Sequence, residues 1–175
     1  HARVGRRVVR LKGGDGFVFG RGMEELQACA EAGVPVRVIP GVTSSVAVPA
    51  LGGIPVTHRG LVQGFSVVSG HVPPGHPAST IDYAALARSG TTLVVLMGVA
   101  TLPAITAALV ENGLDPATPA AIVARGGYPD QQVVLAAVAE IADRAAHVEP
   151  PAITVIGEVA SFAAVTDAPA FEEVI

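Results

Sequence analysis

The stretch "RVVRLKGGDGFVFGRGMEE", residues 7–25, contains three successive local patterns. A β-branched apolar run at 7–11 predicts a strand, and the glycine-rich turn "GGDG" follows it. From about residue 21 to residue 32, apolar side chains recur with helical spacing. A strand, a glycine turn and a helix in this order are typical of α/β proteins that bind a ligand at the turn.

The turn lacks the patterns of two common nucleotide-binding loops. Counted from Gly14, the dinucleotide pattern requires a glycine where Phe19 stands, and the P-loop requires Lys and then Ser or Thr where Gly20 is followed by "RG". The carboxylate of Asp15 would repel a phosphate but suits a cation or a ribose hydroxyl. S-adenosylmethionine has both groups and no phosphate. The alternative is a plain strand-to-helix turn in which Asp15 caps the backbone.

The chain outward from this stretch continues to alternate strand and helix, which predicts an α/β protein with mostly parallel sheets. Further strands are expected at 35–39, 65–70, 91–98, 120–124, at the start of 131–146, and at 152–160. Further helices are expected at 43–51, 82–88, 99–113 and at the end of 131–146.

Two domains and a tail are expected along the chain. The periodic structure lapses in "THRGLVQG", residues 57–64, so we expect an amino-terminal α/β domain at 1–62, a carboxy-terminal α/β domain at 63–165 and a tail at 166–175. The first domain contains two clear strands, which are too few for a stable parallel sheet. We therefore expect it to be incomplete, with its first strands upstream of His1.

The charge distribution is uneven. Half of the 175 residues are apolar and 15% are charged, which is typical of a compact globular chain. Five of the eleven basic residues fall in the first twelve positions, which contain no acid, although the net charge is −4. Such a segment suits an acidic partner, or it is simply a solvated edge. No aromatic side chains interleave the basic ones, so a nucleic-acid partner is not expected.

Other features limit the location and the type of site. Residues 89–110 carry no charge, but Gly98 and Pro103 divide them into a strand and a helix, so no membrane partner is expected. Cys29 is the only cysteine, which excludes an internal disulfide and favours a reducing cytoplasm. No histidines or acids have metal-ligand spacing, so we predict no metal site.

Seven motifs occur in an order that resembles the tetrapyrrole methylase family, in the branch that methylates uroporphyrinogen III. They are "VVRLKGGDGFVFGRG", "VIPGVTSS", "GGIPVTHRG", "SGH", "LVVLMG", "GGYPDQ" and "PAITVIGEV", from Val8 to about Val159. The resemblance implies a two-domain fold, a homodimer, and C-methylation of uroporphyrinogen III to precorrin-2 for sirohaem or cobalamin, with S-adenosylmethionine as donor and S-adenosylhomocysteine as product. The alternatives are a truncated, non-catalytic remnant that binds S-adenosylmethionine or dimerises, and a sister methyltransferase of corrin precursors.

The resemblance also implies site residues, while the catalytic groups are expected upstream of His1. The implied cofactor contacts are Gly13, Gly14, Asp15, Val18, Thr43, Ser44, Met97, Gly126, Ala152 and Thr154. The implied contacts to the many carboxylates of the tetrapyrrole are Arg10 and Arg21, and His71 is a candidate proton carrier or donor to substrate. Two positions depart from the family pattern: Gly16 replaces the usual proline, and Leu96 replaces a tyrosine common before Met97.

Overall fold

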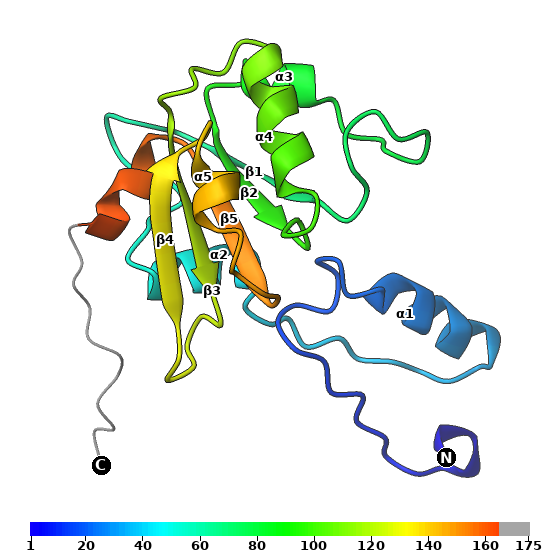
Figure 1. Cartoon of the computed structure of the whole chain (residues 1–175). Helices are drawn as coiled ribbons and strands as arrows, with labels where there is room; N and C mark the ends of the chain where they lie inside the picture. The colour runs from blue at the N-terminus through cyan, green and yellow to red at the C-terminus, as the bar shows by residue number, and fades with distance from the viewer. Residues whose placement is uncertain (165–175) are drawn as a thin grey trace. The chain divides into compact units, whose positions relative to one another are not determined.

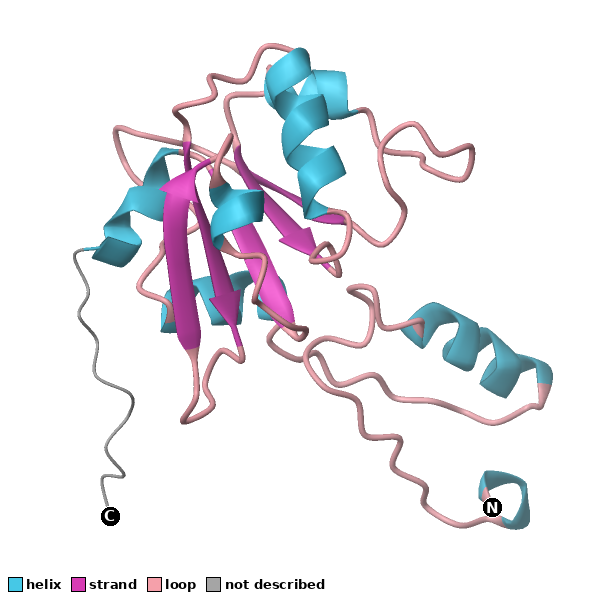
Figure 2. Cartoon of the chain, in the orientation of Figure 1, coloured by secondary structure: helices cyan, strands magenta, loops and turns pink. Residues whose placement is uncertain are grey.

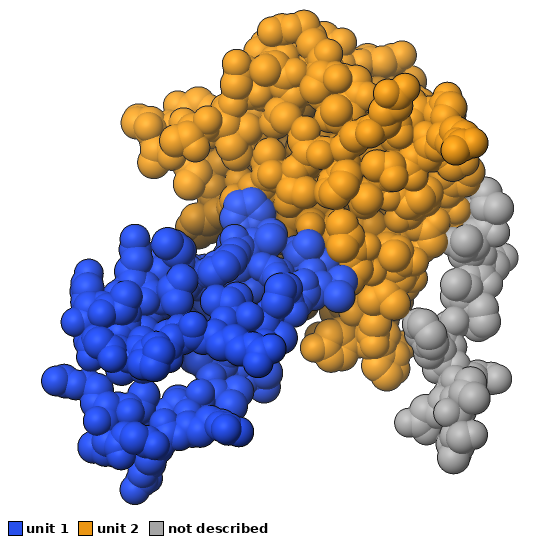
Figure 3. Space-filling view, turned by 180° about the vertical axis from the view of Figure 1, so that it is seen from behind, with its two compact units in different colours: residues 1–44 blue, residues 45–175 orange. Residues whose placement is uncertain are grey.

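The computed structural model describes residues 1–164, so the expected tail at 166–175 lies outside the described residues. The chain forms two compact units, His1–Ser44 and Ser45 onward (Figure 3). These compact units do not test the boundary between two folding domains expected after residue 62, and that boundary stays a prediction.

The second unit is built on a five-stranded sheet with strand order β1-β2-β5-β3-β4 (Figure 1). Its strands are β1 (Phe65–Ser69), β2 (Thr92–Leu96), β3 (Pro119–Ala124), β4 (Gln132–Ala137) and β5 (Ala152–Ile156). All five lie where the sequence predicts strands, which confirms an α/β fold.

The expectation of mostly parallel sheets is wrong for this sheet. β1 and β2 pair in parallel, whereas the β2–β5, β5–β3 and β3–β4 pairs are antiparallel. The helical connections do place β1, β2 and β3 in one direction, as the strand–helix alternation indicates. However, β4 returns directly as a hairpin, and β5 inserts in the opposite direction between β2 and β3. β5 is buried along its whole length, so its apolar run looks like that of a parallel strand.

Helices cover both faces of the sheet (Figure 2). One face packs against α3 (Tyr83–Ala87), α4 (Leu102–Glu111) and α5 (Ile141–Arg144) in a single apolar cluster. The other face packs against α2 (Ser44–Leu51), through Val48, and against the 3-10 helix η2 (Glu158–Ala164). α3 begins at an N-cap, where Asp82 accepts a hydrogen bond of 2.8 Å from the Ala85 N–H. No helix among residues 1–164 is long and apolar enough to cross a membrane.

The first unit contains the helix α1 (Gly22–Glu31), as the sequence predicts, and the short 3-10 helix η1 (Ala2–Val4). The strands expected at 7–11 and 35–39 are absent, and both segments run as loops (Figure 2). A strand is defined by hydrogen bonds to a neighbour, and neither segment has a ladder partner among the described residues. No residue of 1–44 is buried, so the β-branched pattern alone does not form a sheet here.

Candidate functional site

The glycine turn of the first unit is closed by the carboxylate of Asp15. Its Oδ1 accepts a hydrogen bond of 2.8 Å from the Phe17 N–H, and its Oδ2 accepts one of 3.0 Å from the Gly41 N–H. The hydrogen bond from Gly41 is the largest cause, and that from Phe17 the second, of a lowered pKa of the Asp15 carboxyl. The carboxyl therefore stays ionised at neutral pH. Asp15 therefore joins the turn at 13–17 to the loop "PGVTS" at 40–44.

The two loops approach each other so closely that one position requires glycine. A Cβ on Gly41 would overlap the carbonyl oxygen of Gly14 and lie 2.9 Å from its carbonyl carbon. Gly14 itself has φ +66°, and a Cβ there would lie 3.8 Å from the Thr43 Cα and 3.9 Å from the Ser44 N. The structure thus brings Gly14, Asp15, Thr43 and Ser44 together, while Gly13 and Val18 lie in the same turn.

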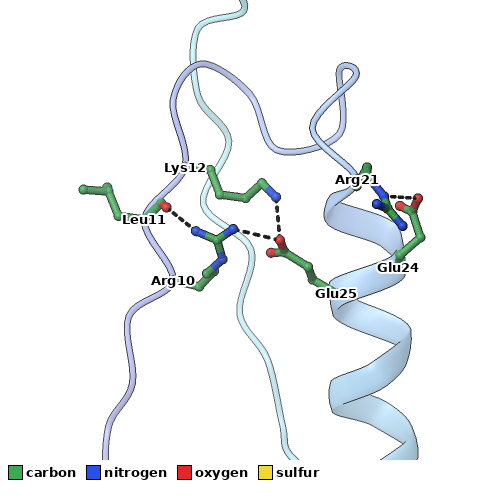
Figure 4. A network of polar contacts seen from close by, with 6 residues as sticks. All are labelled: Arg10, Leu11, Lys12, Arg21, Glu24 and Glu25. Atoms are coloured by element: carbon green, nitrogen blue, oxygen red, sulfur yellow. Dashed lines mark hydrogen bonds and ion pairs between the residues drawn. The ribbon is translucent and has the colours of Figure 1, made fainter.

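The basic residues expected to bind substrate are paired with carboxylates of α1 (Figure 4). Arg10 Nη2 lies 3.0 Å and Lys12 Nζ 2.8 Å from the same oxygen, Glu25 Oε1. Arg21 Nε lies 3.2 Å from Glu24 Oε1, three residues along the chain. The pKa of Glu25 is lowered chiefly by the hydrogen bond from Lys12, so this carboxylate remains charged.

The two arginine pairs are exposed and therefore weak, whereas the Lys12 side chain is only 20% exposed. The Arg10 and Arg21 side chains are 67% and 81% exposed, and exposed ion pairs contribute roughly 0–1 kcal/mol. A competing carboxylate displaces such a partner at little cost. The sequence indicated these two arginines, but it did not indicate their acidic partners. Only the Arg21–Glu24 spacing of three residues is a local signal for a pair.

The second unit gathers its expected site residues at one edge of the sheet. Ser69, Leu96 and Ile153 lie side by side in the register of β1, β2 and β5, and Ala152 pairs with Ala124 at the end of β3. The residues that follow these strand ends, or begin β5, therefore share one edge. They are His71, Met97, Gly126 and Ala152.

Backbone conformation at this edge is unusual. Met97 follows β2 with φ +55° and is 52% exposed, and Arg125 follows β3 with φ +51°. Left-handed conformations at residues other than glycine are uncommon and concentrate at functional sites. The close packing of Gly70 on Gly98, where an added Cβ would lie 2.6 Å from the Gly98 Cα, draws the ends of β1 and β2 together.

Two expected site residues differ from the rest of this edge. Thr154 is 2% exposed in the middle of β5, between Val95 and Ile122, so its side chain offers almost no surface to a ligand. His71 is exposed, and its N–H lies 3.4 Å from the Ser69 Oγ. Among residues 1–164 no group of three His, Cys, Asp or Glu side chains is placed to bind a metal ion.

Residues 1–142 match the family model of the tetrapyrrole (corrin/porphyrin) methylases. The match covers most of the chain, and the chain belongs to this family. A solved relative, the uroporphyrin-III C-methyl transferase from Thermus thermophilus complexed with S-adenosyl homocysteine, is 44% identical with a TM-score of 0.77. That alignment covers 92% of this chain and 70% of the relative.

Curated relatives are longer than this chain. It is 45% identical over 158 residues to siroheme synthase 1 of Yersinia pseudotuberculosis, covering 90% of this chain and 33% of that protein. It is 44% identical over 160 residues to the S-adenosyl-L-methionine-dependent uroporphyrinogen III methyltransferase of Methanosarcina barkeri, covering 90% of this chain and 63% of that protein. The chain thus spans about a third of the siroheme synthase.

Proposed function

We propose that the chain carries out S-adenosylmethionine-dependent C-methylation of uroporphyrinogen III, giving precorrin-2 in sirohaem or cobalamin biosynthesis. The observation that carries this proposal is the contact between the two motif loops of the first unit, fastened by Asp15 and Gly41. Relatives named for this activity, at 44% identity, support it.

The first unit fits S-adenosylmethionine at its glycine turn. An ionised carboxylate has about four acceptor positions, and Asp15 uses one on each oxygen for backbone N–H groups. The remaining positions suit ribose hydroxyls or the positive charge of the sulfonium. The Gly13–Gly14 backbone next to it carries no side chains that would keep a ligand away. Thr43, Ser44 and Val18 complete the proposed contacts.

The edge of the sheet in the second unit provides the other proposed cofactor contacts. Met97 and Gly126 follow the carboxyl ends of β2 and β3, which run in the same direction, and Ala152 begins the antiparallel β5 at the same edge. The carboxyl ends of same-direction strands are the place where open α/β sheets bind ligands. Because Thr154 is almost fully buried, we propose that it contributes least of these residues to cofactor binding.

The substrate is proposed to meet the basic segment around Arg10 and Arg21. Uroporphyrinogen carries eight carboxylates, and the exposed pairs with Glu25 and Glu24 are easily displaced by them. His71 is proposed as a hydrogen-bond donor to substrate. These contacts bind and orient the tetrapyrrole.

Methyl transfer needs alignment more than acid–base chemistry in its first step. S-adenosylmethionine supplies a methyl group on a positively charged sulfur. A pyrrole carbon of the substrate provides the electron pair and attacks in line with the carbon–sulfur bond, which breaks and leaves its electrons on the sulfur. The methylated carbon already carries a side chain and has no hydrogen, so the positively charged ring system then loses a proton from another position to a base. The role of this chain's glycine turn and sheet edge is to orient donor and acceptor and to exclude water.

A paired experiment tests the proposal. Calorimetric titration with S-adenosylhomocysteine is run beside a methylation assay with uroporphyrinogen III on the same protein. Binding together with turnover supports the enzyme, whereas binding without turnover favours the non-catalytic remnant. Turnover of a later corrin precursor in place of uroporphyrinogen III favours the sister methyltransferase. If the protein shows neither binding of S-adenosylhomocysteine nor turnover, the proposed ligand is wrong.

Assembly and location are also proposals. We propose a homodimer in the cytoplasm with no nucleic-acid or membrane partner, on the basis of the family resemblance and the composition. Light scattering coupled to size-exclusion chromatography tests the dimer, and a monomer at micromolar concentration would contradict it.

A further inference from the structure

The turn between β3 and β4, residues 125–131, contains an arginine whose neighbours fix its side chain. Arg125 Nε forms an ion pair with Asp130 Oδ2, and the guanidinium carbon lies 5.0 Å from the centre of the Tyr128 ring. The ion pair raises the pKa of Arg125 and lowers that of Asp130, so both are charged. The Arg125 guanidinium therefore lies over the Tyr128 ring, and Asp130 binds it at its Nε.

Hydrogen bonds of the backbone and of the Gln131 amide also hold this turn. The Gly127 N–H donates to Gln131 Oε1 at 2.8 Å, and Gln131 Nε2 donates to the Leu51 carbonyl at 3.0 Å. The Tyr128 N–H also donates to the Arg125 carbonyl at 2.9 Å. Since backbone and amide bonds already order the turn, the charged pair is available for another role.

Arg125 lies at the sheet edge that carries the proposed cofactor contacts. It precedes Gly126, and its N–H donates to the Pro151 carbonyl at 2.9 Å, next to Ala152. Its side chain is 45% exposed, and that of Asp130 is 59% exposed. The contact to Asp130 uses Nε, and neither Nη group has a hydrogen-bond partner within residues 1–164, so both suit another acceptor. This edge of a guanidinium binds a carboxylate through two parallel hydrogen bonds.

We propose that Arg125 is a substrate-binding residue that takes a carboxylate of the tetrapyrrole, with Tyr128 supporting the guanidinium and Asp130 restraining its affinity. Asp130 places a negative charge beside the position of the incoming carboxylate, so it weakens binding by repulsion. This inference rests on the proposed function, since the many-carboxylate substrate comes from there.

Two variants of this pair are expected to act in opposite directions. Affinity for uroporphyrin III, a stable eight-carboxylate probe, is measured by fluorescence titration. R125A is expected to weaken binding by about tenfold, because a charge-assisted bidentate contact is lost. D130N keeps an acceptor for Nε but removes the charge, so it is expected to tighten binding by about threefold, with a steeper dependence on salt. R125K, which keeps the charge without the fork, is expected to fall between R125A and wild type.

A matched control comes from α5 of the same unit. Arg144 is also exposed and paired with a carboxylate, Glu140 at 3.9 Å, but it does not lie in the 125–131 turn. R144A makes the same change of charge and is expected to alter probe affinity by less than about twofold, as an exposed surface charge does. Circular dichroism and thermal unfolding of each variant show whether it is folded, and R125K replaces R125A if the latter is not.

The outcomes separate this inference from the proposed function. If wild type binds S-adenosylhomocysteine and uroporphyrin III but R125A binds the probe as wild type does, the role of Arg125 is wrong and the proposed function stands. If R125A and D130N weaken binding equally, the pair is only structural and the inference is overturned. If wild type binds neither ligand, the proposed function itself fails. Opposite shifts for the two variants, absent in R144A, support the inference.

Discussion

Replacement of Gly41 by alanine tests the contact between the two motif loops. The new Cβ would overlap the Gly14 carbonyl oxygen and lie 2.9 Å from the Gly14 carbonyl carbon and 3.4 Å from the Asp15 N. All three atoms belong to the backbone, so relief requires the loops to separate. Forced overlap of this kind costs about 1–3 kcal/mol. If the loops must be together to bind S-adenosylhomocysteine, its affinity falls by about 5- to 150-fold.

Gly16 provides a matched control two positions from Gly14. A Cβ on Gly16 would meet only the Lys12 side chain, at 3.6 Å from Cδ, which is ordinary contact. Its φ lies outside the left-handed region, so Gly16→Ala is tolerated there and gains roughly 0.4–1 kcal/mol by restricting the unfolded chain. Calorimetric titration with S-adenosylhomocysteine is therefore expected to separate the two variants clearly.

The pKa of Asp15 gives a readout that does not depend on any ligand. The hydrogen bond from the Gly41 N–H is its largest cause of depression, so the pKa measured by NMR is expected to rise toward the ordinary value in Gly41→Ala and to stay low in Gly16→Ala. Equal pKa values and equal affinities in the two variants would refute the idea that this contact organises the site.

Three further predictions concern single positions. Thr92 is 1% exposed, and its hydroxyl has no hydrogen-bond partner among residues 1–164. Thr92→Val is therefore expected to stabilise the protein by about 1 kcal/mol in thermal unfolding. Val94→Thr on the same strand is expected to destabilise it by a similar amount or more. Ile105 is fully buried in α4, and Ile105→Ala is expected to cost about 2–5 kcal/mol in urea unfolding, while a cost below 1 kcal/mol would contradict its place in the core. Because the folded pKa of Asp15 is depressed, its contribution to stability is present above the ordinary pKa of 3.8 and is lost as pH falls through the depressed pKa. The midpoint of the pH-dependent change in the Gly41 amide shift is therefore expected below pH 3.8.

Elements whose identity depends on local pattern were predictable from the sequence. The helix expected at about 21–32 is Gly22–Glu31, and the buried run "TLVVL" is the strand Thr92–Leu96. In both, the side-chain spacing and the glycines at the ends determine the structure, and distant residues only choose which face is covered.

Strand pairing was not predictable, because it depends on partners far apart in the chain. The segments 7–11 and 35–39 have strand composition but no ladder, since composition does not supply a neighbour. Conversely, the position of β5 between β2 and β3 requires knowledge of the whole sheet. A fully buried antiparallel strand and a parallel one carry the same apolar run.

The site was predictable to the level of motifs but not of contacts. The turn around Asp15 was found from its glycines and its charge, and both readings of Asp15 remain compatible because its oxygens cap the backbone and keep acceptor capacity. The partner of Arg10 was not found, since Glu25 lies fifteen residues away and meets it only when the chain folds back along α1. The sequence did not indicate Arg125 as a candidate site residue. Its proposed role depends on a turn conformation and an ion pair, and neither has a sequence signature.

Because β5 lies in the middle of the sheet, the sheet of the second unit cannot be completed until β5 has been synthesised. β5 contains residues 152–156, so the middle of the sheet is the part that a ribosome delivers last among the strands. Until it arrives, β2 and β3 each present an open apolar edge, and such edges pair readily with other chains. The sheet closes by pairing β5 with β2, some sixty residues earlier, a long-range step that slows folding. Expression at lower temperature, or with chaperones that shield strand edges, is therefore expected to raise the soluble yield of this chain.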